Sequence, residues 1–212
     1  MRTIFRQRRH SAAPASPDFQ SEKLVAYEAG WRSQLAPRAS LSLSVFYNDY
    51  ADLRTTSPAP VVVFPVRFGN GWEGHAYGVD AWASFRPFPW WRLDPGFGVL
   101  RKDFHLKPGE ADIAGIQTVL GHDPGHQVFL HSYLDLPHDL ELYVGLRQVA
   151  GLPDIGVPSY FEADVRFAWH VTPKLELSLA GVNLVHARHA EASQPPALEI
   201  PRSVYLGVRW SF

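Results

Sequence analysis

Histidine and carboxylate side chains gather near the C-terminus in a spacing that could bind a metal ion. His186, His189 and Glu191 offer ligand types that zinc accepts, and His122 with His126 is the next best pair among the ten histidines. In an extended strand, however, residues three positions apart point to opposite faces, so His186 and His189 converge only if the chain turns there. We therefore expect solvated loop histidines and predict no metal site.

Asp123, with His122 and His126, is the nearest approach to a catalytic acid–histidine group. The chain has no H-E-x-x-H motif, no G-x-S-x-G motif and no paired-carboxylate spacing to support hydrolysis. It also has no cysteine, which excludes a thiol nucleophile. We predict no catalytic residue and a protein that is not an enzyme.

The segment from Gly69 to Gly74 matches the dinucleotide-binding pattern G-x-G-x-x-G, and Asp94 lies about 20 residues further on. That pattern works by opening a helix whose N-terminus holds a pyrophosphate. Here Tyr77 to Phe85 alternates as a strand does, and Pro87 follows. The match is therefore accidental, and we predict no cofactor.

The composition narrows the class of protein. The 212 residues fit one domain, and a net charge of -1 argues against a nucleic-acid partner. No stretch approaches the 18 or so apolar residues of a membrane helix. Aromatic residues make up 13% of the chain, with 7 Trp, 8 Tyr and 13 Phe. Such rings collect at bilayer interfaces, so a membrane β-barrel becomes a serious possibility.

The first 20 residues differ from the remainder. Residues 1–10 are basic, but no apolar run follows them, so we see no export signal. Residues 1–20 contain Pro14 and Pro17 and do not alternate. We expect an irregular N-terminal segment over residues 1–20, followed by one β domain over residues 21–212.

From Leu24 onward the chain repeats segments of roughly ten residues in which apolar and polar side chains alternate. The clearest segment runs from Phe161 to Val171. Its apolar members, which share one face, are Phe161, Ala163, Val165, Phe167, Trp169 and Val171. Glu162, Asp164, Arg166 and His170 occupy the other face. This period of two predicts an all-β fold.

The breaks between these segments alternate between short and long. Short breaks fall at 36–38, 87–90, 137–139 and 172–174, and long ones near 51–63, 105–125, 150–157 and 188–201. Tight turns on one rim and long loops on the other are typical of an outer-membrane barrel. We expect the turns in the periplasm and the loops outside the cell.

This division predicts about nine antiparallel strands. They are 24–35, 39–50, roughly 64–86, 91–104, 126–136, 140–150, 158–171, 175–187 and 202–212. Single-chain bacterial barrels have even strand numbers. An open edge leaves about five N–H and five C=O groups unpaired, and two such edges in lipid cost on the order of tens of kcal/mol. We therefore predict that the sheet pairs with further strands that this chain lacks.

Several segments resemble TonB-dependent outer-membrane receptors, in the order in which that family has them. They are Ser21–Gly30, Phe46–Leu53, Ala76–Asp80, Gly181–Leu184 and the closing Ile200–Phe212, which ends in an aromatic residue. Val185-His186 stands where the family pattern usually ends in an acid.

The resemblance implies a transmembrane barrel of 22 strands, of which this chain matches the C-terminal part. In that family an N-terminal plug, which TonB pulls, admits a scarce ligand such as a siderophore, cobalamin, metal chelate or glycan. The plug and the first strands have no counterpart here, so we expect contact with TonB only through that absent plug. Uptake by this chain alone is not expected. The setting implied is the outer membrane of a Gram-negative cell, with its lipid as a partner.

Two sets of residues are assigned roles in the membrane. The resemblance implies that the barrel assembly machinery recognises the alternating terminal strand, and the residues assigned to this signal are Val204, Leu206, Val208, Trp210 and Phe212. Trp90, Trp91 and Trp169 are assigned to a periplasmic aromatic girdle. The loops 51–73, 105–125 and 188–201 are expected to help form an extracellular ligand vestibule.

Two other functions stay open at this point. One is a complete small outer-membrane barrel acting as an adhesin, a pore or an omptin-like protease. The other is a secreted soluble β-protein. The soluble protein would bury the face of Val165, Phe167 and Trp169 against a second layer, whereas a membrane wall would leave this face uncovered.

Overall fold

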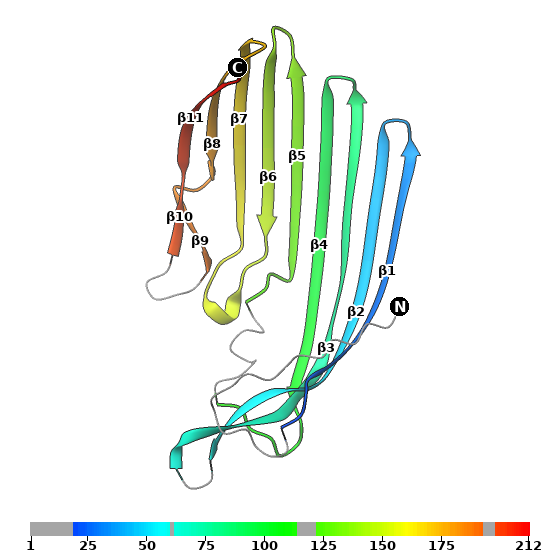
Figure 1. The fold of residues 1–212 in the computed structure, drawn as a ribbon, viewed down its shortest axis with the longest axis vertical. Helices are drawn as coiled ribbons and strands as arrows, with labels where there is room; N and C mark the ends of the chain where they lie inside the picture. Colours follow the sequence, from blue (N-terminus) through cyan, green and yellow to red (C-terminus); the bar gives the residue numbers. More distant parts are fainter. Residues whose placement is uncertain (1–18, 60–61, 114–121, 193–197) are drawn as a thin grey trace. The chain divides into compact units, whose positions relative to one another are not determined.

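The computed structural model describes residues 19–59, 62–113, 122–192 and 198–212 (Figure 1). The strands are β1 (Lys23–Ala36), β2 (Ala39–Ala59), β3 (Val62–Phe88), β4 (Trp91–Leu106), β5 (His126–Leu136), β6 (Leu140–Val149), β7 (Tyr160–Thr172), β8 (Leu175–Val182), β9 (Arg188–Ala192), β10 (Leu198–Pro201) and β11 (Ser203–Trp210). A short 3₁₀ turn, η1, covers Pro153–Ile155. No helix in the described ranges is long and apolar enough to cross a membrane.

Nine strands form one sheet in the order β1-β2-β3-β4-β5-β6-β7-β8-β11, and β9 and β10 form a separate hairpin. The ladders from β4 to β8, and from β8 to β11, are antiparallel. The end strands β1 and β11 are not neighbours in this order, so the described sheet is not closed. The predicted all-β fold and the number of strands in its wall are confirmed.

Tight turns join the strands in pairs, as predicted, and Figure 1 shows these turns at the same end of the sheet as the C-terminus. In the turn from β5 to β6, His138 has a φ of 67° and Asp139 a φ of 59°. Two successive left-handed residues are typical of a type I′ hairpin, whose twist matches that of its strands. Local turn geometry thus determines the end of the sheet that carries the tight turns.

One predicted long break, at 51–63, proves to be wrong. Strand β2 continues to Ala59 and β3 begins at Val62, so most of the expected 51–63 break is hairpin. Asp52 interrupts the regular backbone with a φ of 58°, a conformation that Asp tolerates, and the strand resumes beyond it. The expected break at 188–201 holds β9 and β10, with residues 193–197 outside the described part of the chain.

The chain divides into two compact units, which we describe separately. Unit 1 comprises residues 1–29, 44–79 and 100–123, and unit 2 comprises residues 30–43, 80–99 and 124–212. The predicted irregular segment 1–20 lies almost wholly outside the described residues, which begin at Phe19.

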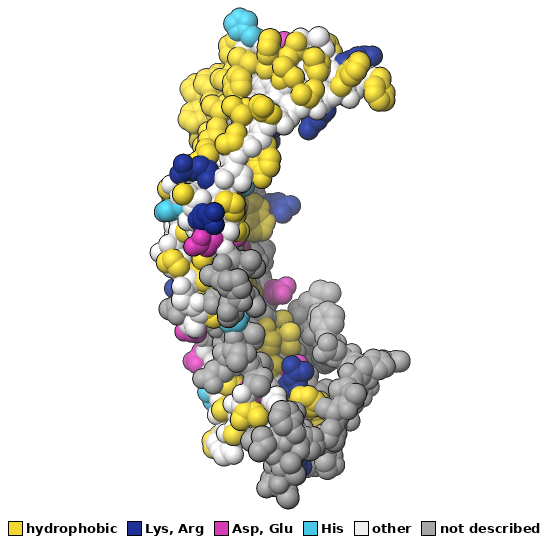
Figure 2. Space-filling model, turned by 90° about the vertical axis from the view of Figure 1, so that its left-hand side faces the viewer, with side chains coloured by type: hydrophobic (Ala, Val, Ile, Leu, Met, Phe, Trp, Pro, Cys, Tyr) yellow, Lys and Arg dark blue, Asp and Glu magenta, His cyan; other side chains and the backbone are white. Residues whose placement is uncertain are grey.

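Unit 2 is a wall with one apolar face. Strand register places Leu142, Phe167, Leu179 and Leu206 in one row across β6, β7, β8 and β11. Phe167 is 40% exposed and Leu206 86% exposed, and no described segment covers this face. Figure 2 shows hydrophobic side chains gathered toward the end of the wall where β11 finishes. The uncovered face is what a membrane wall requires and what a soluble sandwich avoids.

Unit 1, in contrast, contains buried side chains. Leu53, Thr55, Trp72 and Ala76 are all less than 9% exposed. The segment after β4 folds back along the β2–β3 hairpin. The Lys107 N–H donates to the Gly71 carbonyl at 2.8 Å, and the Ile113 N–H donates to the Thr56 carbonyl at 2.7 Å. A small protein core therefore forms where the sequence predicts open loops.

Gly74 permits a close approach between β3 and β4 in unit 1. Its φ is 153°, and a Cβ atom there would overlap the carbonyl oxygen of Asp103 and lie 2.6 Å from the Cα atom of Phe104. Both of those atoms belong to the backbone, so neither can rotate away. Only glycine fits this position.

Candidate functional site: the two faces of the wall and their ends

The face of unit 2 opposite the apolar one carries a charged network near the tight turns. Arg166 pairs with Glu176 and lies 3.8 Å from Glu141. Glu141 also contacts His170 at 2.8 Å, and Arg209 contacts Glu176 at 3.2 Å. Polar side chains that satisfy each other across four strands suit a water-facing barrel interior.

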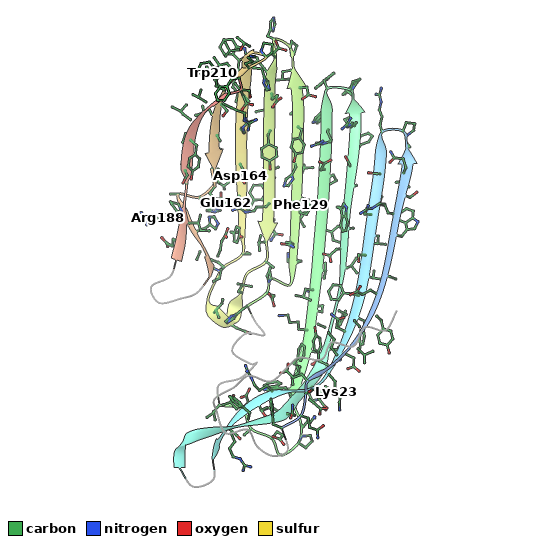
Figure 3. The ribbon with its side chains drawn as sticks, viewed as in Figure 1. Lys23, Phe129, Glu162, Asp164, Arg188 and Trp210 are labelled. Carbon is green, nitrogen blue, oxygen red and sulfur yellow. The ribbon has the colours of Figure 1, made fainter. Side chains whose placement is uncertain are left out.

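Aromatic rings occupy the same polar face further along the strands. The Arg92 guanidinium lies 4.1 Å from the ring centroid of Tyr133, and the Tyr133 and Tyr143 rings are 5.1 Å apart. Phe129, labelled in Figure 3, lies across Gly96, where any Cβ atom would overlap its ring. The interior face thus combines rings and charges, a mixture that suits contact with polar organic surfaces.

The predicted periplasmic aromatic residues lie beside the tight turns. The rings of Phe88 and Trp90 stack at 5.2 Å, and those of Trp90 and Trp91 at 6.2 Å. Trp91 Nε1 donates to Ser132 Oγ at 2.9 Å. Trp169 pairs with Leu140, which directly follows the turn from β5 to β6. This geometry suits an aromatic girdle, and the assignment of Trp90, Trp91 and Trp169 to one stays a prediction.

A second aromatic group lies in unit 1, and the sequence analysis missed it. The rings of Tyr27 and Tyr47 are 6.5 Å apart, and those of Tyr47 and Tyr77 are 6.4 Å apart. All three tyrosines line a shallow apolar hollow together with Val45 and Ala29. The signal was present in the sequence, because Tyr27, Tyr47 and Tyr77 each fall within one of the alternating segments.

The terminal strand presents the alternating side chains predicted to form the assembly signal. Val204, Leu206, Val208, Trp210 and Phe212 are all highly exposed, and their exposed fractions run from 65% for Val204 to full exposure for Phe212. Register pairs Leu206 with Leu179 and Val208 with Leu177, which places them on the apolar face of the wall. Figure 3 shows Trp210 near the tight-turn end. Recognition by the assembly machinery stays a prediction.

The C-terminal histidines do converge, because the chain turns at Asn183, whose φ is 57°. Glu162, fully buried on β7, lies 2.8 Å from His186 Nδ1 and 3.3 Å from His189 Nδ1. His189 Nε2 lies 2.9 Å from Glu191 Oε1. Within the described ranges, no three His, Asp or Glu side chains are arranged to hold a metal ion. The group is a set of close polar contacts between two histidines and two carboxylates.

Arg147 on β6 ties this network to its neighbours. Its guanidinium contacts Asp164 at 3.2 Å, Asn183 Oδ1 at 2.7 Å and Glu191 at 3.2 Å. Burial raises the pKa of Glu191, but the hydrogen bond from His189 and the charge of Arg147 outweigh burial. The pKa of Glu191 is therefore below its ordinary value, and this carboxylate is ionised at neutral pH.

The remaining motifs gain no chemical role. Asp123 forms an ion pair with Lys102 in unit 1. The glycine pattern from Gly69 to Gly74 lies inside strand β3, so no helix follows it to receive a phosphate. These two groups show how a motif can match in sequence while its structural setting differs.

A charged group also marks unit 1. Asp52 accepts hydrogen bonds from Lys23 and Lys107, each at 2.6 Å, and its backbone carbonyl accepts one from Asn70 Nδ2, also at 2.6 Å. Trp72 Nε1 donates to Asp112 Oδ2 at 2.7 Å. These bonds fasten the segment after β4 to the β2–β3 hairpin.

Comparison with known proteins identifies the family. The model for the TonB-dependent receptor-like β-barrel matches residues 4–184. The chain belongs to this family. The match extends upstream of residue 21, into the segment expected to be irregular. No curated protein matches the sequence.

Solved structures of TonB-dependent receptors share the fold. The FrpB iron transporter from Neisseria meningitidis (F3-3 variant) has a TM-score of 0.76 at 17% identity, covering 93% of this chain and 32% of that one. The copper transporter OprC has a TM-score of 0.68 at 15% identity, covering 92% and 33%. The ferric yersiniabactin uptake receptor FyuA from Yersinia pestis has a TM-score of 0.65 at 18% identity, covering 92% and 30%. The chain spans about a third of the length of these structures.

The structure explains one segment in which this chain resembles other TonB-dependent receptors. Asn183 adopts a left-handed conformation that Asn tolerates, its N–H donates to Asp164 Oδ1 at 2.8 Å, and its side chain accepts from Arg147. Three residues later His186 stands where the receptor pattern has an acid, and its partner is the buried Glu162. Where the receptor pattern has an acid, this chain therefore has a histidine, and the carboxylate that contacts it lies on β7.

Proposed function

We propose that this chain forms the C-terminal part of the barrel wall of a TonB-dependent receptor in a Gram-negative outer membrane. In this role the chain is not transport-competent alone and is not an enzyme. Further strands complete the barrel, and an N-terminal plug supplies the gate and the contact with TonB. Outer-membrane lipid covers the apolar face, and the barrel assembly machinery inserts the chain.

The combination of an uncovered apolar face with two end strands that do not pair carries the proposal. The apolar row through Phe167, Leu179 and Leu206 needs hydrocarbon, yet β1 and β11 are not neighbours in the described sheet. In hydrocarbon every unpaired backbone group costs several kcal/mol. A nine-stranded sheet with two open edges is therefore stable in lipid only when other strands join those edges.

The proposed ligand is a scarce nutrient carried as a siderophore, cobalamin, metal chelate or glycan. We assign its vestibule to the ends of the strands away from the tight turns, over residues 51–73, 105–125 and 188–201. Charged side chains support the assignment of each segment separately: in unit 1 Asp52 contacts Lys23 and Lys107, and within unit 2 Arg188 contacts Glu199. Residues 60–61, 114–121 and 193–197 of these segments lie outside the described part of the chain.

The first test of the proposal is insertion. The chain would be expressed behind a signal peptide, once alone and once fused to the first strands and plug of a related receptor. We expect only the fusion to show heat-modifiable migration on a detergent gel, because only the fusion closes its edges. Heat-modifiable migration of the chain alone would favour a complete small barrel, and refolding without detergent would favour a soluble β-protein.

The second test is genomic and functional. Sequence upstream of the chain is expected to encode a plug and the earlier strands, in frame or frameshifted. Uptake assays with the restored gene would then identify the ligand, using iron- and copper-limited growth as the first two conditions. An unrelated gene ending directly before this chain would contradict the proposal.

A further inference from the structure

We propose that Glu162, His186, His189 and Glu191 form a proton-dependent clasp that holds the β8–β9 connection and the β9–β10 hairpin against β7. The clasp tightens when His189 gains a proton and loosens when it loses one. All of its residues belong to unit 2, so the inference depends on local geometry and on no particular ligand.

Glu162 is the fixed part of the clasp. Its side chain is fully buried, and its two carboxylate oxygens accept hydrogen bonds from the N–H groups of Val185 at 3.1 Å and His186 at 3.2 Å. His186 Nδ1 lies 2.8 Å from the same carboxylate. A buried carboxylate with these partners anchors the β8–β9 connection to β7 (Figure 3).

His189 is the part that responds to protons. Its side chain is only 5% exposed and lies between two carboxylates, with Nε2 2.9 Å from Glu191 and Nδ1 3.3 Å from Glu162. A neutral imidazole carries one N–H, so one of its nitrogens must present a lone pair to a carboxylate oxygen. An imidazolium presents an N–H to both. In the structure Nδ1 is buried and lacks an aligned hydrogen-bond partner, the situation that a proton would relieve.

The surrounding charges favour this role. Glu162, Glu191 and Asp164 bring three carboxylates to the group, and Arg147 is the guanidinium that contacts two of them. The Tyr160 ring lies 4.5 Å from that of His189, and this contact holds the imidazole in place. Arg202 contacts the Val185 carbonyl at 3.3 Å, and Arg188 pairs with Glu199.

The four carboxylates exceed the three guanidiniums by one negative charge, which one protonated imidazole would balance. Histidine is the side chain whose charge ordinarily changes between pH 5 and 8. His186 also departs from the receptor pattern, which has an acid there. The clasp is therefore a feature of this chain, and it makes the β9–β10 hairpin, which belongs to the proposed vestibule segment 188–201, sensitive to external pH.

A spin-label experiment tests the clasp in outer membranes. The barrel is completed by fusion to the first strands and plug of a related receptor, as in the insertion test. This chain contains no cysteine, so Ala187→Cys gives it one labelling site, on the β8–β9 connection, when the added strands and plug are also free of cysteine. Arg38→Cys, in the turn from β1 to β2, gives a matched control away from any histidine pair. We expect the mobile fraction of the Ala187 label to rise about tenfold from pH 6 to pH 8.5, because a charge-assisted bond is lost. The control label should not respond.

Two variants separate the clasp from a general effect of pH. His189→Gln keeps a polar side chain that does not titrate, and it should leave the Ala187 label equally mobile at both pH values. Glu191→Gln keeps the volume of the side chain but removes one carboxylate, and it should shrink the response. If His189→Gln does not assemble, Glu191→Gln still decides the question. An unchanged pH response in either variant, or no response in the parent chain, would overturn the proposal. Insertion is checked separately by heat-modifiable migration, so a failure of the barrel proposal is recognised as such.

Discussion

The apolar side chains of unit 1 and unit 2 meet different surroundings. In unit 1, Trp72 is 4% exposed, and its indole nitrogen donates to Asp112 on the segment that follows β4. In unit 2, Trp90 is 45% exposed, and Leu206 projects freely from β11. The same strands contribute to both units, and both contain alternating sequence. The comparison shows that alternation defines two faces and does not determine whether protein or lipid covers the apolar one.

The largest expected effect comes from the buried indole. Trp72→Ala should weaken the packing of the segment after β4 by about 3–5 kcal/mol, because it removes a large buried side chain and the bond to Asp112. Cleavage after Glu110 by a glutamate-specific protease should accelerate accordingly. The matched control Trp90→Ala removes a ring that protein does not bury, and it should leave that cleavage unchanged. Equal effects of the two substitutions would remove the distinction between the units.

A charge on the apolar face of unit 2 should be the next most damaging change. Phe167→Arg places a guanidinium in the row of Leu142 and Leu179, and this should destabilise the inserted barrel by about 2–4 kcal/mol. Urea unfolding in lipid vesicles measures the change. Tyr205→Arg, near the same depth on the opposite face of β11, serves as the control and should be almost neutral. A neutral Phe167→Arg would mean that lipid does not cover this face.

The close approach of backbones in unit 1 predicts a smaller effect. Gly74→Ala should destabilise the unit by about 1–3 kcal/mol, because the new Cβ atom meets the backbone at Asp103 and Phe104. Gly30→Ala is the control, since its Cβ atom would meet only the Leu43 carbonyl oxygen at 3.8 Å. Cleavage after Glu110 by a glutamate-specific protease measures the first change, and urea unfolding measures the second. Tolerance of Gly74→Ala would show that β3 and β4 can separate there.

The smallest expected effect is the loosening of the clasp in strong acid. The pKa of Glu191 is lowered in the folded protein, so its contribution is fully present above its unfolded pKa and is lost as pH falls through the lowered folded value. The Ala187 label should therefore become mobile again in strong acid, after tightening between pH 8.5 and pH 6. Glu191→Gln should remove part of this acid phase. A label whose mobility falls steadily to the lowest pH would contradict the sign of this shift.

Much of unit 2 could be predicted from the sequence, because its strands obey a local rule. The alternation from Phe161 to Val171 assigned both faces of β7, and the ladders with β6 and β8 confirm that assignment. The tight turns followed from proline and other turn-forming residues between the segments. Register, face and turn each depend on residues close together in the chain, which is why the pattern alone was sufficient.

Unit 1 and the clasp could not be predicted in this way. Asp112 contacts Thr56 and Trp72, which are 56 and 40 residues away in the chain, and no local pattern connects them. The histidine spacing likewise argued against convergence. His186 and His189 meet at Glu162 only because Asn183 turns the chain and β7 supplies a carboxylate more than twenty residues away.

The sequence by itself determined an all-β wall with one apolar face, tight turns on one rim, and a terminal strand that resembles those of TonB-dependent receptors. Alternation and turn formation are local properties, so they can be recognised without knowing which strands are neighbours. Only the tertiary structure decided that β2 and β3 continue past Asp52, that a small core forms beneath Trp72, and that two histidines flank a buried carboxylate. Each of these depends on contacts between distant segments, whose free energy becomes available only once the ladder has brought those segments together.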